Sequence, residues 1–324
     1  MSKILGIGNA LVDIMTRLDD DRILAELNLP KGSMQLVDLQ VSGRVLEASK
    51  HLEKQLTSGG SAANTIYGLS MLGMETAFIG KIGKDEYGDV FRKDLEACGI
   101  IPLLLTSETH SGRAIALVSS DSERTFATHL GAAVELEDED LDHTQFDGYD
   151  FFHIEGYLVQ NHSLLKKAVT LAKEKNLKVS LDLASYNIVE ENLSFLKPIV
   201  EDFVDIIFAN EEEAKAFTGK EPRDAVHEMA GMCDIAVVKT GEKGSLIKQK
   251  DQLHEIGIIR VSSIDTTGAG DLYASGFLFG LVNNYPLEKC GRIGAILAGN
   301  IIEVIGARMD IVRWDSIRKL IADL

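Results

Sequence analysis

A glycine-rich turn before an apolar helix is the strongest chemical signal in this sequence. In SSIDTTGAGDLYASGFLFGLV, a strand-like run ends at Asp265 and a helix is predicted to begin at about Ala269. Gly268 and Gly270 let the backbone approach a ligand closely, and the free N–H groups that start the helix would face an anion. Asp271, in the first turn, could take a proton from an attacking hydroxyl. The string predicts an anion site with a base beside it.

The same turn also has a purely structural explanation. In an isolated GxGD sequence, Asp271 would merely complement the positive end of the helix dipole. The full string is more specific, because it resembles the DTxGAGD signature of the ribokinase-like (PfkB) carbohydrate kinases. The resemblance implies that the amides of Gly268, Ala269 and Gly270 form the anion hole for a transferred phosphate, and that Asp271 is the catalytic base.

A second glycine pair points to the acceptor side of such a reaction. In TSGGSAANTIYGLSMLG, Gly59 and Gly60 precede a predicted helix that carries Asn64 near its start. Taken alone, two glycines before a helix serve equally well as a loop. The string resembles the N-terminal GGxxxN signature of the same family. This implies that the glycine pair is a hinge in contact with the substrate and that the Asn64 side chain holds a sugar hydroxyl.

Three more segments extend the resemblance on the acceptor side. GNALVDI looks like the first strand of the adenosine-kinase branch, which implies that Asn9 and Asp13 bind ribosyl or sugar hydroxyls; an Asx turn is the structural alternative for Asp13. In HIEGY, Glu155 ends a strand, and the resemblance implies a carboxylate on the substrate side or in a metal network. SERTF (Ser122–Phe126) carries Arg124, which is either near the transferring phosphate or a solvated surface arginine.

The nucleotide side rests on three weaker matches. NEEEAKAFTG resembles the NxxE motif, so that Asn210 and Glu213 would place Mg²⁺ and phosphate, although a bare Asn210 is typical of a helix N-cap. VVKTGEKGS implies Thr240 and Gly241 beside the ATP phosphates and ribose, with an ordinary hairpin as the alternative. AGNIIEVIGA implies an adenine contact for Asn300, whose partner could equally be protein.

The resemblance implies ATP and Mg²⁺ as cofactors and adds a monovalent cation. This ion, usually K⁺, would lie behind the anion hole near Asp265 and Thr267, with carbonyl groups of the loop Ile302 to Gly306. The acidic residue is retained at Asp265, and the sequence says little about the other ligands.

These residues need a scaffold that gathers strand ends at one edge. From about residue 150, short apolar runs alternate with segments of helical period, which predicts an α/β fold: a doubly wound, mostly parallel sheet flanked by helices. The predicted strands begin at Phe151, Lys178, Asp205 and Ile235, and the helices between them are His162–Asn176, Glu190–Phe203 and Arg223–Cys233.

A small β lid is predicted above the carboxyl ends of that sheet. Segments of about 12–38 and 100–129 contain strand-like pieces joined by polar turns, without a long helix between them. Ligands of open α/β sheets bind at the carboxyl ends of the strands, under such a lid. No linker of Pro, Gly or Ser divides the chain, so we expect one domain over residues 1–324.

Composition excludes several function classes. The chain has 324 residues, with 33 Lys and Arg against 50 Asp and Glu, and its formal charge of −17 argues against nucleic-acid or membrane-surface partners. The N-terminus is not a signal peptide, and three widely spaced cysteines fit a reducing cytoplasm. The sequence lacks the motifs GxxxxGK[ST], GxGxxG, HExxH and GxSxG. This argues against a P-loop NTPase, a dinucleotide-binding enzyme, a zinc protease and an α/β-hydrolase.

We therefore expect an ATP-dependent kinase that phosphorylates the primary hydroxyl of a small sugar or a nucleoside. A nucleoside would need an apolar slot for its base, to which Met34, Leu36, Phe126 or Tyr157 could contribute. The alternative is a non-catalytic nucleotide or sugar sensor on the same fold. A kinase of a pyrimidine or vitamin alcohol is disfavoured by GGSAAN and Asp13. Exposed lid edges also predict a homodimer.

Overall fold

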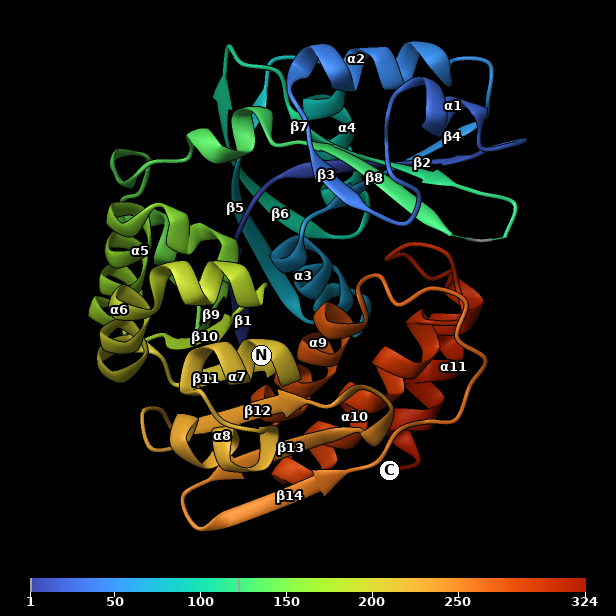
Figure 1. Cartoon of the computed structure of the whole chain (residues 1–324). Coiled ribbons are helices and arrows are strands. Elements are labelled where there is room, and N and C mark those ends of the chain that lie inside the picture. The colour runs from blue at the N-terminus through green and yellow to red at the C-terminus, as the bar shows by residue number, and fades with distance from the viewer. Residues whose placement is uncertain (1, 122) are drawn as a thin grey trace.

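Two sheets of unequal size organise the chain (Figure 1). The structure is a computed structural model that describes residues 2–121 and 123–324, and within these ranges its strands form a nine-stranded and a five-stranded sheet. The strand order of the large sheet is β14-β13-β12-β11-β10-β9-β1-β5-β6. Its strands are β1 (Lys3–Ile7), β5 (Glu75–Gly83), β6 (Ile100–Ser107), β9 (Phe151–Glu155), β10 (Lys178–Asp182), β11 (Ile206–Asn210), β12 (Ile235–Lys239), β13 (Ser245–Gln249) and β14 (Gln252–Ile256).

The large sheet is mostly parallel, as the sequence predicts. All pairs from β12 through β6 are parallel, and only β13 and β14 continue the sheet as antiparallel strands. The predicted strands after residue 150 are confirmed as β9, β10, β11 and β12. Their apolar runs, such as IIFA in β11, are buried on both faces, because helices cover each side of the sheet.

The helices fall into two layers around the large sheet. One layer packs on the core that contains Phe152 and Phe217, and the other on the core that contains Phe208 and Phe277. The first layer is α5 (His162–Glu174), α6 (Tyr186–Phe203), α7 (Glu211–Thr218) and α8 (Pro222–Met229); the second is α3 (Ser61–Met71), α9 (Ala269–Val282), α10 (Leu287–Ile301) and α11 (Ile311–Ala322). Helix α9 contacts both α3 and α10, which explains why it is apolar all round.

The smaller sheet corrects the predicted lid boundaries. Its strand order is β3-β8-β7-β2-β4, and the strands are β2 (Leu11–Arg17), β3 (Met34–Leu36), β4 (Lys54–Gly59), β7 (Gly112–Val118) and β8 (Arg124–His129). Residues 100–107 were expected here, but they form β6 at the edge of the large sheet; β4 lies outside the predicted ranges. Short apolar runs such as IIPLLL carry no sign of which sheet they join. Ser122 lies outside the described residues.

One face of the small sheet is directed towards the large sheet. The register aligns Asp13 with Ala114, and Met34 with Phe126, so Asp13, Met34, Leu36, Arg124 and Phe126 share one face. The opposite face is covered by α1 (Arg22–Glu26), α2 (Leu39–Ala48) and α4 (Glu86–Ala97). In Figure 1 the small sheet has α2 on its outer side and α9 on its inner side. No helix among the described residues is long and apolar enough to cross a membrane.

Candidate active site

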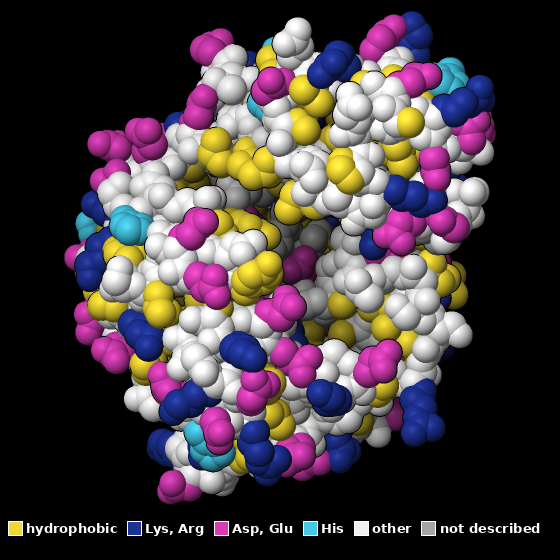
Figure 2. Space-filling model, in the orientation of Figure 1, with side chains coloured by type: hydrophobic (Ala, Val, Ile, Leu, Met, Phe, Trp, Pro, Cys, Tyr) yellow, Lys and Arg dark blue, Asp and Glu magenta, His cyan; other side chains and the backbone are white. Residues whose placement is uncertain are grey.

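Polar side chains gather at the carboxyl ends of the parallel strands. Glu155, Asp182, Asn210 and Lys239 are the last residues of β9, β10, β11 and β12, and Asn9 follows β1. Parallel strands deliver their carboxyl ends to one edge of a sheet, where open α/β folds bind ligands. Figure 2 shows a hollow between the two sheets, with an acidic side chain visible inside it and hydrophobic side chains near its rim. The candidate site is this hollow.

The glycine turn before α9 has the geometry that the sequence predicts. Gly268 caps the helix with a left-handed φ of 73°, and a Cβ there would lie 2.9 Å from the Cβ of Ala307. Only glycine combines that conformation with that approach. The N–H groups of Gly268, Gly270 and Asp271 meet no hydrogen-bond acceptor within the described ranges, whereas that of Ala269, also expected in the anion hole, donates to Thr266 O at 3.2 Å. The turn therefore presents open donors to the hollow, and these fit the phosphate groups of a nucleotide.

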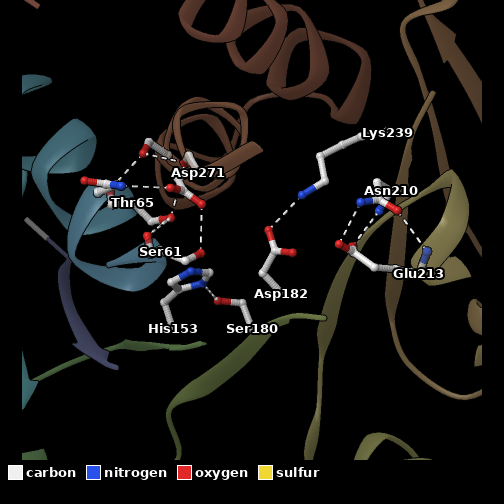
Figure 3. Close-up of polar contacts among 11 residues, drawn as sticks. Ser61, Thr65, His153, Ser180, Asp182, Asn210, Glu213, Lys239 and Asp271 are labelled. Atoms are coloured by element: carbon white, nitrogen blue, oxygen red, sulfur yellow. Dashed lines mark hydrogen bonds and ion pairs between the residues drawn. The ribbon is translucent and has the colours of Figure 1, made fainter. Parts of the chain in front are cut away.

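Asp271 is held by two side chains of the facing helix α3. Ser61 Oγ donates to Oδ1 at 2.8 Å, and Asn64 Nδ2 donates to Oδ2 at 3.0 Å, as Figure 3 shows for Ser61. Burial raises the pKa of Asp271 to about 6, while these two hydrogen bonds oppose the shift. The carboxylate is therefore ionised at neutral pH and still basic enough to accept a proton.

Glu155 and the glycines around it form the floor of the hollow. Its carboxylate accepts from Asn9 Nδ2 at 2.7 Å and from the Ala62 N–H at 3.2 Å, and burial raises its pKa to about 7. Gly60 has φ of 98°, and a Cβ there would overlap the carbonyl oxygen of Asn9. A Cβ on Gly8 would lie 2.6 Å from Glu155 Oε2. Gly8 therefore leaves space for the Glu155 carboxylate, and Gly60 leaves space for the Asn9 carbonyl group.

Asp13 faces the hollow from the small sheet. Its carboxyl group lies against Gly59, where a side chain would overlap it, so the first glycine of the pair is also explained by space. Burial raises the pKa of Asp13 to about 6; the charge of Arg308 opposes this and that of Asp271 adds to it. Arg308 donates from Nη2 to Ser58 Oγ at 2.6 Å and from Nη1 to Asn64 Oδ1 at 3.4 Å.

Arg124 binds the residues that were expected to hold a potassium ion. Its guanidinium donates to both carboxylate oxygens of Asp265 and to Thr267 Oγ1. Asp265 also accepts the Gly306 N–H at 2.6 Å and the Thr267 N–H at 2.7 Å. Every oxygen of Asp265 thus has a donor, and the guanidinium already neutralises its charge. This arrangement does not fit a monovalent cation; instead, Arg124 joins the small sheet to the glycine turn.

The NxxE residues adopt the helix-cap arrangement that was the structural alternative. Asn210 Oδ1 accepts the Glu213 N–H at 2.8 Å, while Glu213 accepts from the Asn210 N–H at 2.8 Å and from Nδ2 at 2.7 Å. Burial raises the pKa of Glu213 to about 7, against the attraction of Lys239. The capping pair still leaves lone pairs of Glu213 free to accept from a water molecule, so a role with hydrated Mg²⁺ stays a prediction.

Three predicted nucleotide residues make local hydrogen bonds within their own turn or helix. Thr240 and Gly241 form the turn between β12 and β13, in which the Thr240 N–H donates to Gly244 O at 2.8 Å. Asn300 Nδ2 donates to Ile296 O of its own helix at 2.9 Å. Their roles towards ATP stay predictions.

Sequence reasoning missed several residues of the hollow. Ser61 is the residue directly after the glycine pair, and Arg308 follows the loop that was considered for the cation. Lys239 donates to Asp182 Oδ2 at 2.8 Å, and Figure 3 shows this pair between Asp271 and Glu213. Asp182 and Lys239 could have been found from the sequence, because each lies at the end of a predicted strand. His153 is not one of these residues: it is fully buried inside β9, shares a hydrogen bond of 2.9 Å with Ser180 Oγ, and has its pKa lowered by burial to about 4.

Known proteins share this architecture along most of the chain. A model of the pfkB family of carbohydrate kinases matches residues 34–313. An adenosine kinase structure from Sinorhizobium meliloti is 32% identical with a TM-score of 0.86, over 98% of this chain and 99% of that one. A probable sugar kinase from Rhizobium etli is 30% identical with a TM-score of 0.87, over 98% of both chains. A nucleoside kinase from Methanocaldococcus jannaschii is 30% identical over 80% of this chain and 83% of that protein.

Proposed function

Because the chain belongs to the pfkB family of carbohydrate kinases, we propose that it transfers the γ-phosphate of Mg-ATP to the primary hydroxyl of a nucleoside. The observation that carries the proposal is the pairing of the Asp271 carboxylate with the open N–H groups of the turn at Gly268 and Gly270. A base and an anion hole side by side are what transfer of a phosphoryl group to an alcohol requires. A sensor would need neither.

Phosphoryl transfer depends on positioning and on neutralisation of charge more than on covalent chemistry. In this mechanism Asp13 and Asn64 orient the acceptor so that its hydroxyl faces Asp271. Asp271 removes the hydroxyl proton as the oxygen attacks the γ-phosphorus, and ADP leaves as the bond between that phosphorus and the bridging oxygen breaks. The amides of Gly268, Gly270 and Asp271 stabilise the charge on the transferring group. The small sheet, tied to the turn by Arg124, would exclude water that otherwise hydrolyses ATP.

Mg²⁺ fits this site as an ion carried by the nucleotide. Within the described ranges no group of three His, Cys, Asp or Glu side chains could hold a metal. Magnesium keeps several waters and binds phosphate oxygens, so few protein ligands are needed. Asn210 and Glu213 would hold its water shell, and the ion would neutralise charge on the phosphate oxygens.

The inner face of the small sheet supports a nucleoside as acceptor. Met34 and Leu36 are 57% and 67% exposed, and they share this face with Phe126 and with Asp13. A free sugar has no apolar part to cover them, whereas the base of a nucleoside whose ribose binds Asp13 does. The adenosine kinase and nucleoside kinase among the similar proteins support the same choice.

An acceptor screen tests this proposal. We expect ADP release with Mg-ATP to be faster on adenosine, inosine or guanosine than on ribose or fructose, by at least about tenfold in kcat/KM, since base burial contributes a few kcal/mol. Leu36→Ser should lower kcat/KM for the nucleoside several-fold. Leu320→Ser, at an exposed position on α11, serves as control. Faster turnover of a free sugar would instead establish a sugar kinase, and Met34 and Leu36 would then have no role in binding a nucleobase.

The acid limb of the pH profile should respond to Ser61. Ser61→Ala removes a hydrogen bond that lowers the pKa of Asp271, so that pKa should rise above about 6. The acid limb of kcat/KM should then move to higher pH by about half a unit to one unit, because one pKa unit corresponds to about 1.4 kcal/mol. Thr65→Val is the matched control, since the Thr65 hydroxyl donates to the backbone carbonyls of Ser61 and Asp271 rather than to the Asp271 carboxylate. An unchanged limb in Ser61→Ala would contradict the assignment of this limb to Asp271.

A further inference from the structure

Lys239 is a cation in the hollow for which the proposed mechanism has no use so far. It ends β12, its side chain is only 16% exposed, and its ammonium donates to Asp182 Oδ2 at 2.8 Å. The Asp182 side chain is 6% exposed. Burying a lysine and an aspartate together costs desolvation of both charges, so a structural reason or a functional reason should exist for the pair.

The position of the ammonium group points to the glycine turn. A Cβ placed on Gly270 would lie 3.1 Å from Lys239 Nζ, so the lysine reaches over the first turn of α9. The same turn presents the open N–H groups beside Asp271. A tetrahedral anion held by those N–H groups would therefore lie within reach of both Asp271 and Lys239.

The carboxylates around Lys239 favour a cation at this position. Burial alone would lower the pKa of Lys239, but the negative charges of Asp182, Glu213 and Asp271 together raise it above its ordinary value, so the ammonium stays charged. These carboxylates would repel the phosphates of a nucleotide. The two arginines nearby are engaged elsewhere, Arg124 with Asp265 and Arg308 with Ser58.

We propose that Lys239 binds the γ-phosphoryl group during transfer, and that Asp182 holds the ammonium in place until the nucleotide arrives. The inference rests on the proposed kinase function and adds a residue to it. As the phosphoryl group is transferred, negative charge spreads over its oxygens, and their attraction to the ammonium group increases. This attraction is strong because the site is shielded from water. The proton and the phosphoryl group move as before; Lys239 changes only the charge that faces them.

Charge-neutralising variants separate this role from a merely structural ion pair. Lys239→Met alone leaves Asp182 buried without a partner and is expected to lose stability. Lys239→Met/Asp182→Asn removes both charges and should return the unfolding midpoint close to that of wild type. We expect its kcat to stay about 10²-fold or more below that of Asp182→Asn, and its affinity for ATP to fall more than its affinity for ADP. Lys178→Met, which removes two lysine–carboxylate contacts at the opposite end of β10, is the control.

The outcomes distinguish the inference from the proposed function. If the double variant matches Asp182→Asn in kcat and in its ratio of ATP to ADP affinity, while wild type turns over, Lys239 is a structural partner and the inference is wrong. If calorimetry shows that wild type binds neither nucleotide, the proposed function fails and the inference fails with it. A wild type that binds ATP more tightly than ADP, with this preference lost in the double variant, supports the role of Lys239 even before an acceptor is known.

Discussion

Asp271→Asn is expected to lower kcat by about 10³-fold or more, while the dissociation constant for ATP stays within a few-fold of the wild-type value. The amide keeps the shape and can still meet Ser61, but it cannot accept the proton of the attacking hydroxyl. Loss of a negative charge beside the glycine turn should, if anything, tighten ATP binding. The expected signature is therefore a protein that binds nucleotide and does not turn over.

Steady-state ADP release and calorimetry with ATP measure the two sides of this prediction. Asp224→Asn is the matched control, because Asp224 occupies the first turn of α8 and is exposed on another part of the surface. Turnover within tenfold of wild type in Asp271→Asn would remove Asp271 as the base. Loss of ATP binding together with turnover would indicate that the variant disturbs the turn itself.

Asp13→Asn is expected to lower kcat/KM for the acceptor by about 10²-fold, because a charged hydrogen bond to a hydroxyl contributes about 1.5–3 kcal/mol. The same change should stabilise the protein at pH 8. Burial raises the folded-state pKa of Asp13 to about 6, above its ordinary value, so folding at pH 8 must keep a charge where a proton is preferred. A chain optimised only for stability would not place a carboxylate here.

The stabilisation by Asp13→Asn should depend on pH. Because the pKa of Asp13 is higher in the folded protein than in the unfolded chain, its protonated carboxyl group contributes stability at pH values below the unfolded-state pKa. This contribution is lost as the pH rises through about 6. The gain in the free energy of unfolding for Asp13→Asn should therefore be near zero at pH 4 and reach about 1–2 kcal/mol at pH 8, discounted for partial exposure. Chemical denaturation at both values measures it, with Asp19→Asn as an exposed control. A variant less stable than wild type at pH 8 would contradict the account of Asp13.

The glycine turn before α9 was predictable because local sequence determines it. Gly268 is demanded by the left-handed backbone at the start of α9, Gly270 leaves space for the end of the Lys239 side chain, and Asp271 follows in the same first turn, so the arrangement is contained in a few consecutive residues. The parallel sheet was also predictable, since buried strands and amphipathic helices alternate from β9 to β12. The resemblance to PfkB kinases joined these pieces into one family, which the comparisons confirm.

Contacts between distant segments were not predictable in the same way. Arg124 and Asp265 are far apart in sequence, and only the pairing of β8 within the small sheet brings the guanidinium to the turn. Lys239 and Asp182 meet because only β11 separates β12 from β10 in the sheet. Position at a strand end signals that a residue faces the hollow, but not which partner it finds there.

The lid boundaries failed for a related reason. Strand β6 joins the large sheet by pairing with β5, while β4 joins the small sheet beside β2, and neither choice is visible in the composition of those strands. The homodimer through the small sheet stays a prediction. Strands β3 and β4 are the edges that would be available for it.

The most direct test of the central claim is proton-coupled phosphorus NMR of one reaction mixture containing the protein, Mg-ATP and adenosine. We predict that a phosphate monoester signal split into a triplet by a neighbouring CH₂ group grows in step with ADP, and that Asp271→Asn produces neither. Inorganic phosphate in place of the ester would contradict phosphoryl transfer to an acceptor. A doublet would show that a secondary hydroxyl is attacked, and the assignment of the primary hydroxyl facing Asp271 would be wrong.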